Sequence, residues 1–296
     1  MFPSDFAYHT PGSLAEALDL LRGGSDGDGE VKVLAGGQSL LPMMKLRLAE
    51  PSALVDLAKV PELRGITEDG NGGVVLGAAT TYFQAIHSPL VQRRCPLIIQ
   101  AVRQVGDPQV RARGTIGGSL AHADPAGDLP AVALALNAEL RAAGSQGNRS
   151  IAAGDFFVDM MTTALEPGEV LTSVRFEATD TPRTGTAYLK HRHPASGYAV
   201  VGVAAVVRLA DDGSCADVRV GLTGAGTHAV RASGVEQSLA GKQPDEATIV
   251  SACAHMADGI DLMGDTYASE EFRAHLAQVL GRRALTLAVA QAHGQP

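Results

Sequence analysis

Cysteine is scarce in this chain, and the few cysteines stand far apart. Only three occur, Cys95, Cys215 and Cys253, and no two of them form a CxxC pair. An iron–sulfur cluster or a structural zinc ion needs a set of closely placed ligands, thiolates above all. This chain by itself therefore cannot supply four thiolates to such a centre, and we expect free thiols of a reducing compartment.

An excess of basic residues and long apolar runs are also missing. The chain has 24 Lys and Arg against 32 Asp and Glu, a formal charge of −8. That balance argues against nucleic acid as a partner, because phosphates attract a basic face. The longest apolar run, Ala199 to Val207, is half a membrane span and contains Gly202. The first residues lack the basic and apolar regions of a signal peptide. We therefore expect a cytoplasmic protein without a membrane span.

What is present is the composition of a globular protein with more than one domain. The chain has 296 residues, of which 45% are hydrophobic and 19% charged. Such a length exceeds the size at which one core usually keeps growing. The polar segment 177–185, with Pro182 and Gly185, is the expected boundary. We predict an N-terminal domain over 1–178, with subdomains of about 1–60 and 61–178, and a C-terminal domain over 184–292.

Hydrophobic periodicity predicts an α+β fold whose parts differ in character. The first subdomain is predicted to be a small βαβ-type unit, with a helix over 13–22 and strands over 31–34 and 53–57. The second combines short helices with a hairpin between Ile66 and Leu76. The C-terminal domain is predicted to hold helices and a three-stranded antiparallel sheet, with strands at 187–190, 200–209 and 218–222.

Two glycine-rich loops are candidate ligand sites. Ala35-Gly36-Gly37-Gln38-Ser39 follows the apolar run 31–34, and Gly114-Thr115-Ile116-Gly117-Gly118-Ser119 lies further along. Paired glycines let a backbone approach a ligand closely, and successive amides can converge on an anion. Each loop can also be an ordinary tight bend. The first is not a GxGxxG dinucleotide motif. Together the two loops could hold one diphosphate from opposite sides.

Titratable side chains follow the second loop. Asp124 and Asp128 lie four residues apart, close to His122. The two carboxylates could be an acid–base pair, a metal site or acceptors for sugar hydroxyls, and Asp128 could instead cap a helix. His191 and His193 have the spacing of metal ligands on a strand, but Lys190 and Arg192 beside them repel a cation, which favours a basic cluster.

These motifs together resemble one family, the FAD-binding medium subunits of the molybdenum hydroxylases, such as xanthine dehydrogenase and aerobic carbon monoxide dehydrogenase. The segments that carry the resemblance are 34–48, 106–119 with 123–130, 196–202 and 273–285. The resemblance thus covers nearly the whole chain. It implies an N-terminal FAD-binding region of the vanillyl-alcohol-oxidase type, made of two α/β subdomains, and a C-terminal domain with a three-stranded sheet and helices.

The resemblance also implies roles for particular residues. Asp128 would accept hydrogen bonds from sugar hydroxyls of the adenosine part, with His122 and Asp124 along the same stretch. Tyr198 would lie against the isoalloxazine, and Lys190 near the flavin or its phosphates. The side chains of Leu40 and Ile116 would give the isoalloxazine apolar surroundings. The diphosphate would be bound by the backbone amides of Ala35, Gly36, Gly37, Gln38, Ser39, Thr115, Ile116, Gly117, Gly118 and Ser119.

Members of this family work beside two other polypeptides. The resemblance implies a large subunit with a molybdopterin cofactor and a small subunit with two [2Fe–2S] clusters, assembled as a dimer of heterotrimers. FAD in this chain would take electrons from the clusters and pass them to an external acceptor, while the large subunit sets the substrate. The competing hypotheses are a free-standing FAD-dependent oxidoreductase with its own substrate pocket and a scaffold that binds no redox cofactor.

Overall fold

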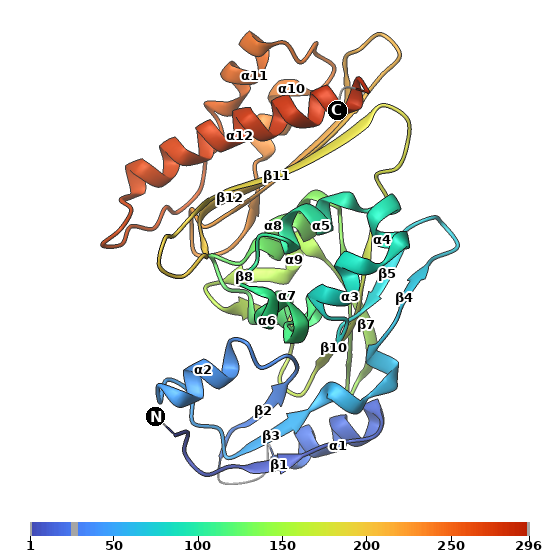
Figure 1. Cartoon of the computed structure of the whole chain (residues 1–296), viewed down its shortest axis with the longest axis vertical. Helices are drawn as coiled ribbons and strands as arrows, with labels where there is room; N and C mark the ends of the chain where they lie inside the picture. Colours follow the sequence, from blue (N-terminus) through green and yellow to red (C-terminus); the bar gives the residue numbers. More distant parts are fainter. Residues whose placement is uncertain (1, 25–28, 295–296) are drawn as a thin grey trace.

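The computed structural model describes residues 2–24 and 29–294, which form three successive parts along the long axis of the molecule (Figure 1). The first part contains β1 (Ala7–His9), α1 (Leu14–Gly24), β2 (Val31–Leu34), α2 (Leu40–Lys45), β3 (Ala53–Asp56) and the 3-10 helices η1 (Leu57–Lys59) and η2 (Pro61–Leu63). Its sheet is parallel, with the order β1-β3-β2. Parallel strands need crossover connections: α1 lies in the connection from β1 to β2, and α2 lies in the connection from β2 to its neighbour β3. Ala17 and Leu21 of α1 share a small core with Val55 of β3.

The middle part is built on an antiparallel sheet of order β4-β5-β10-β6-β7. Its strands are β4 (Ile66–Glu68), β5 (Val74–Gly77), β6 (Glu139–Gly144), β7 (Gly147–Ala152) and β10 (Val170–Phe176). The helices are α3 (Tyr82–His87), α4 (Pro89–Arg94), α5 (Pro96–Val102), α6 (Pro108–Arg113), α7 (Ile116–His122), α8 (Asp128–Ala135) and α9 (Ala153–Phe156). A small hairpin, β8 (Phe157–Asp159) and β9 (Thr162–Thr163), follows α9. Every residue of α8 is buried, as expected for a helix whose side chains after Asp128 are all apolar.

The last part is an antiparallel sheet covered on one face by helices. It contains β11 (Thr184–Arg192), β12 (Ala199–Leu209), β13 (Cys215–Thr223), β14 (Val230–Arg231), α10 (Ser233–Leu239), α11 (Glu246–Cys253) and α12 (Glu270–Ala292). Side chains of a strand alternate between faces. Val203 and Val207 of β12 therefore pack toward the helices, whereas Ala204 and Val206 pack against the middle part. The helix α12 crosses the outer face of the sheet (Figure 1).

The predicted α+β fold class is confirmed, and the structure adds the short helices α4, α6, α7 and α9 and some short strands that were not predicted. The parallel sheet gains β1, the central sheet gains β7, and the predicted three-stranded C-terminal sheet gains β14 at its edge. β14 has only two residues, which pair with Gly221 and Leu222. Such edge strands are too short to show a period in the sequence, because their pairing depends on the neighbouring strand. Among the described residues, no helix is both long and apolar enough to span a membrane.

Candidate functional site

The two glycine loops, far apart in the sequence, touch each other in the fold. A Cβ added at Gly36 would lie 2.3 Å from the carbonyl oxygen of Arg113 and 2.8 Å from the Cα of Gly114. Only glycine allows this approach. Gly37 has φ +72°, a left-handed conformation that glycine adopts without strain. The first loop connects β2 to α2, and the second connects α6 to α7, so the loops join the first part of the chain to the middle part.

Free backbone amides are concentrated in the first loop. Within residues 2–24 and 29–294, the amides of Gly36, Gly37, Gln38 and Ser39 donate to no protein acceptor. The loop is nevertheless ordered from within, because the Gln38 side-chain amide donates to the Gly36 carbonyl at 3.2 Å. Four successive open amides before a helix are suited to bind an anionic group. This arrangement agrees with the predicted diphosphate site.

The second loop differs from the prediction in part. Thr115 caps α7 by accepting the Gly118 amide at 3.0 Å. The amides of Ile116 and Gly117 donate to the carbonyls of Thr80 and Ala78, both at 2.9 Å, so they cannot serve as free donors to a diphosphate. A Cβ at Gly117 would lie 2.4 Å from that of Ala78. The glycine is therefore required for packing against the end of β5, a reason that the sequence did not reveal.

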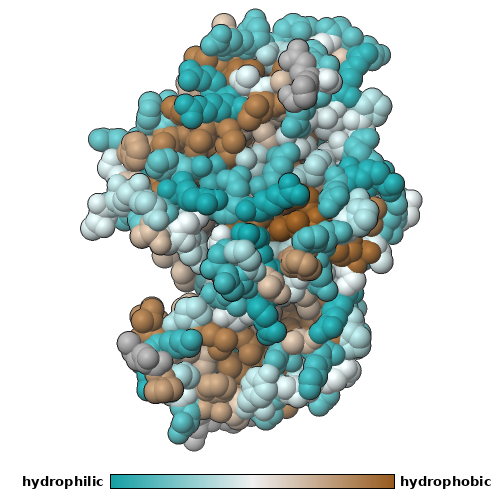
Figure 2. All heavy atoms as spheres, viewed as in Figure 1, coloured by the Kyte–Doolittle hydropathy of each residue, from teal (hydrophilic) through white to brown (hydrophobic). Residues whose placement is uncertain are grey.

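One cavity of about 600 Å³ lies between the loops. In the space-filling view, a hollow separates the N-terminal lobe from the rest of the molecule on the left side (Figure 2). Three of the predicted cofactor-binding residues do not line the cavity: Ile116, Gly117 and Lys190. Three residues that line it were not predicted from the sequence: Met43, Tyr82 and Met161. The predicted residues that do line it are Ala35, Gly36, Gly37, Gln38, Ser39, Leu40, Thr115, Gly118, Ser119, His122, Asp124, Asp128 and Tyr198.

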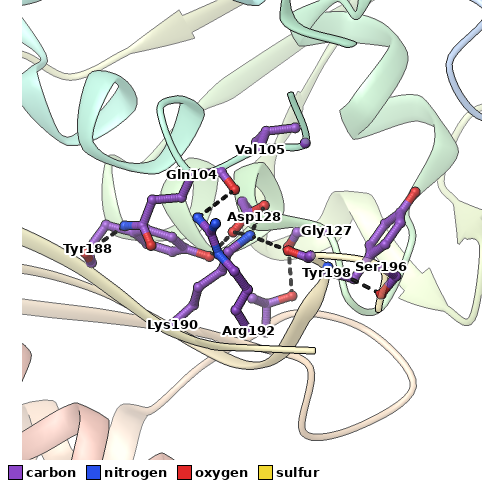
Figure 3. Close-up of polar contacts among 12 residues, drawn as sticks. Gln104, Val105, Gly127, Asp128, Tyr188, Lys190, Arg192, Ser196 and Tyr198 are labelled. Carbon is purple, nitrogen blue, oxygen red and sulfur yellow. Dashed lines mark hydrogen bonds and ion pairs between the residues drawn. The ribbon is translucent and has the colours of Figure 1, made fainter. Parts of the chain in front are cut away.

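Asp128 forms a buried polar cluster at the edge of the cavity. Lys190 and Tyr188 of β11 point toward it (Figure 3). The Tyr188 hydroxyl donates to Asp128 Oδ1 at 2.5 Å, and Lys190 Nζ lies 2.8 Å from Oδ1 and 2.9 Å from Oδ2. Burial raises the pKa of Asp128 above its ordinary value, with the Lys190 charge opposing this, and burial lowers the pKa of Lys190. Asp128 is the first residue of α8 and makes no side-chain cap. Its oxygens instead tie the helix to the C-terminal sheet.

Lys190 does not line the cavity itself, but it binds two residues that do, Asp128 and Gly197. Besides Asp128, its ammonium group donates to the Gly197 carbonyl at 2.9 Å, which holds the turn that carries Tyr198. Its hydrogen bonds are therefore made within the protein, so the position that the resemblance implied for Lys190, near the flavin or its phosphates, stays a prediction. Tyr198 is 43% exposed and lines the cavity. Burial raises its pKa, and a hydrogen bond with Ser39 of the first loop opposes this shift.

His122 and Asp124 face each other loosely at the cavity wall. His122 Nε2 lies 4.0 Å from Asp124 Oδ2, while Asp124 Oδ1 accepts the Ala126 amide at 2.8 Å. Over the part of the chain that the structure describes, no three His, Cys, Asp or Glu side chains are grouped to hold a metal ion. His191 and His193 instead pack against aromatic rings, those of Phe272 and Tyr267 respectively.

The residues present fit FAD on geometric grounds. The cavity volume falls within the roughly 300–1,000 Å³ of small-molecule sites. It combines open amides for a diphosphate with apolar and aromatic walls from Leu40, Met43 and Tyr82, which suit flat rings. The buried Asp128 carboxylate lines the same cavity and can accept further hydrogen bonds, because an ionised carboxylate has about four acceptor positions.

Comparisons with known proteins point in the same direction. A family model described as the FAD binding domain in molybdopterin dehydrogenase matches residues 4–176, and one described as the CO dehydrogenase flavoprotein C-terminal domain matches residues 186–288. The chain is 40% identical to the carbon monoxide dehydrogenase medium chain of Hydrogenophaga pseudoflava, over 98% of this chain and 99% of the relative. It is 36% identical to the nicotine 6-hydroxylase medium subunit of Paenarthrobacter nicotinovorans, over 96% and 97%.

Solved structures show the same similarity. A chain of the carbon monoxide dehydrogenase from Hydrogenophaga pseudoflava superposes with a TM-score of 0.93 at 40% identity, covering 98% of this chain and 99% of the other. A chain of quinoline 2-oxidoreductase from Pseudomonas putida 86 superposes with a TM-score of 0.91 at 34% identity, covering 99% of both.

Proposed function

We propose a function for this chain on the premise that it belongs to the family of FAD-binding medium subunits of molybdenum hydroxylases. It is an oxidoreductase subunit that works with a large and a small partner subunit. In our proposal it takes electrons from [2Fe–2S] clusters of the small subunit and passes them to an external acceptor. Oxidation of the substrate belongs to the large, molybdopterin-containing subunit, and the complex is a dimer of heterotrimers.

The observation that carries the proposal is the meeting of the two loops at one cavity. The amides from Gly36 to Ser39 would bind the diphosphate, with the hydroxyls of Thr115 and Ser119 on the opposite side. Gly118 lines the same wall, but its amide already donates to the Thr115 hydroxyl. Bound FAD would supply one-electron and two-electron transfer. The chain would supply binding, orientation and exclusion of water rather than acid–base catalysis.

Other residues of the cavity would orient the two ends of FAD. Asp128, held by Lys190 and Tyr188, would accept hydrogen bonds from sugar hydroxyls, with His122 and Asp124 along the same wall. The ring of Tyr198 would cover the isoalloxazine, because it lines the cavity and remains partly exposed.

We further propose that the chain divides into an FAD-binding domain over 1–178 and a C-terminal domain over 184–292. Support comes from the separate sheets on either side of residues 177–183. A cytoplasmic location is also proposed. It is supported by the three cysteines, which are free and buried and therefore suit a reducing compartment.

Ser39→Asp tests the diphosphate site without disturbing the fold. Ser39 is the N-cap residue of α2 but makes no side-chain cap, so aspartate there favours the helix. The new charge would face the open amides and repel the diphosphate. One pair of unit charges at 4 Å costs about 1 kcal/mol in water. Two phosphate charges then cost about 2 kcal/mol, and FAD binding should weaken roughly thirtyfold.

The measurement is titration of the purified apoprotein with FAD, followed by flavin absorbance and fluorescence. Ser88→Asp is the matched control, because Ser88 is the N-cap of α4 and does not line the cavity. It should bind FAD like the wild type. If Ser39→Asp bound FAD as tightly as the wild type, the first loop would not be the diphosphate site. A folded wild-type protein that stays colourless with excess FAD would overturn the proposed function. Reduction of the flavin by an organic substrate without partner subunits would favour a free-standing enzyme.

A further inference from the structure

The hairpin of β8 and β9 turns through two residues, Met160 and Met161. Asp159 pairs with Thr162 across the turn, and its carboxylate accepts the Met160 amide at 2.8 Å. The Thr162 hydroxyl donates to the Met160 carbonyl at 3.0 Å. These contacts fix the turn locally, so the conformation of its two central residues is set by the hairpin itself.

Met161 occupies this turn in a conformation that methionine rarely adopts. Its φ is +49°, in the left-handed region. Two-residue hairpin turns usually place glycine or asparagine at such positions, because a side chain there is strained. Non-glycine residues in strained conformations persist where their surroundings hold them, and they are frequent at ligand sites. The chain thus carries a long side chain at a position where glycine would fit better.

The neighbouring methionine provides an internal comparison. Met161 lines the cavity between the glycine loops, and Met160 does not. The two residues are about equally exposed, 50% for Met161 and 47% for Met160. β9 packs against α7, the helix that begins after Thr115, so the hairpin holds Met161 beside the second glycine loop. Accessibility alone therefore does not distinguish the two residues, whereas contact with the cavity does.

We propose that Met161 is a positioning residue for the cofactor, and that its strained backbone is retained because its thioether packs against a flat ring system of FAD at the cavity wall. Thioethers are flexible and polarizable, and they make favourable contacts with aromatic rings. Glycine in the same turn would relieve the backbone and remove that contact. This inference rests on the proposed FAD site.

Met161→Gly separates the two effects, because they have opposite signs. The melting temperature of the apoprotein should be equal to or higher than that of the wild type, whereas the dissociation constant for FAD should rise about tenfold as the apolar contact is lost. Met161→Leu keeps apolar bulk and should restore binding to within about threefold of the wild type. Met160→Gly should leave FAD affinity unchanged.

The readouts are thermal unfolding of the apoproteins, FAD titration, and the visible circular dichroism of the bound flavin, which a purely structural residue would not change. Wild-type affinity and an unchanged flavin spectrum in Met161→Gly would overturn the inference and leave the FAD site standing. A lower melting temperature of apo Met161→Gly would also overturn it, because the turn would then need the side chain for folding. Failure of the wild type to bind FAD would overturn both the site and the inference.

Discussion

The buried pair of Lys190 and Asp128 allows a quantitative test of how the C-terminal sheet is joined to the FAD-binding region. The side chain of Lys190 is 1% exposed and that of Asp128 is 6% exposed, so water screens their interaction little. Lys190→Met keeps the length of the side chain and removes the charge. The carboxylate then remains buried with the Tyr188 hydroxyl as its remaining side-chain donor among the described residues.

The expected loss follows from the cost of a buried charge without its partner. Removing one member of a buried ion pair costs about 3–5 kcal/mol. For cooperative units of this size, each kcal/mol corresponds to roughly 2–4 °C. Lys190→Met should therefore lower the melting temperature by roughly 6–20 °C. The double variant Asp128→Asn with Lys190→Met removes both charges and should recover most of this loss.

The pH dependence of stability tests the role of the buried Asp128–Lys190 pair a second time. Burial raises the pKa of Asp128 above its ordinary value of 3.8. The folded state therefore holds the carboxyl proton more tightly than the unfolded state, and the associated stability is lost as pH rises through the folded pKa. Without Lys190 this pKa should rise further. The melting temperature of Lys190→Met should then lie below that of the double variant by less at pH 5 than at pH 8.

Differential scanning calorimetry of the three proteins at both pH values measures these effects. The reasoning is refuted if Lys190→Met melts with the wild type, or if the double variant is no more stable than the single one. In the first case the pair would contribute nothing to joining the two parts. In the second case the loss would come from packing around Lys190 rather than from the stranded charge.

Two further predictions concern packing and pH. Gly117→Ala should give a poorly folded protein by circular dichroism, because its Cβ would lie 2.4 Å from that of Ala78, whereas Gly154→Ala, with no heavy atom within 4 Å of the added Cβ, should fold normally. The Arg149 hydrogen bond lowers the pKa of Glu169 below 4.5, so its contribution to stability is present above pH 4.5 and lost as pH falls through the folded pKa. Glu169→Gln should therefore melt below the wild type at pH 7, and the difference should shrink toward pH 3.

The sequence predicted the fold class and most of the longer elements, because these depend on local patterns. The run 31–34 was predicted as a strand and forms β2 with the same bounds. The first helix was predicted to cover 13–22, and α1 covers Leu14–Gly24. The short strands β1, β7 and β14 escaped prediction, since two to six residues with mixed burial carry little periodicity.

The sequence indicated the two loops of the candidate site. It did not indicate which of their residues contact other parts of the protein and which remain open to a ligand. Glycine pairs in a sequence show that a backbone approaches something closely, but not what it approaches. Gly36 meets the second loop itself, and Gly117 meets Ala78, so only part of the glycine signal reflects a ligand. Lys190 has the charge of a phosphate ligand, yet its donors are used by Asp128 and Gly197.

By itself, the sequence determined most of the longer helices and strands, and it indicated two loops suited to a diphosphate, because both properties depend on neighbouring residues. Only the tertiary structure decided which amides remain open, which cations are already paired, and that Met161 lies at the cavity. These properties depend on contacts between segments far apart in the chain, such as Gly36 with Arg113 and Asp128 with Lys190, and no local pattern records such contacts.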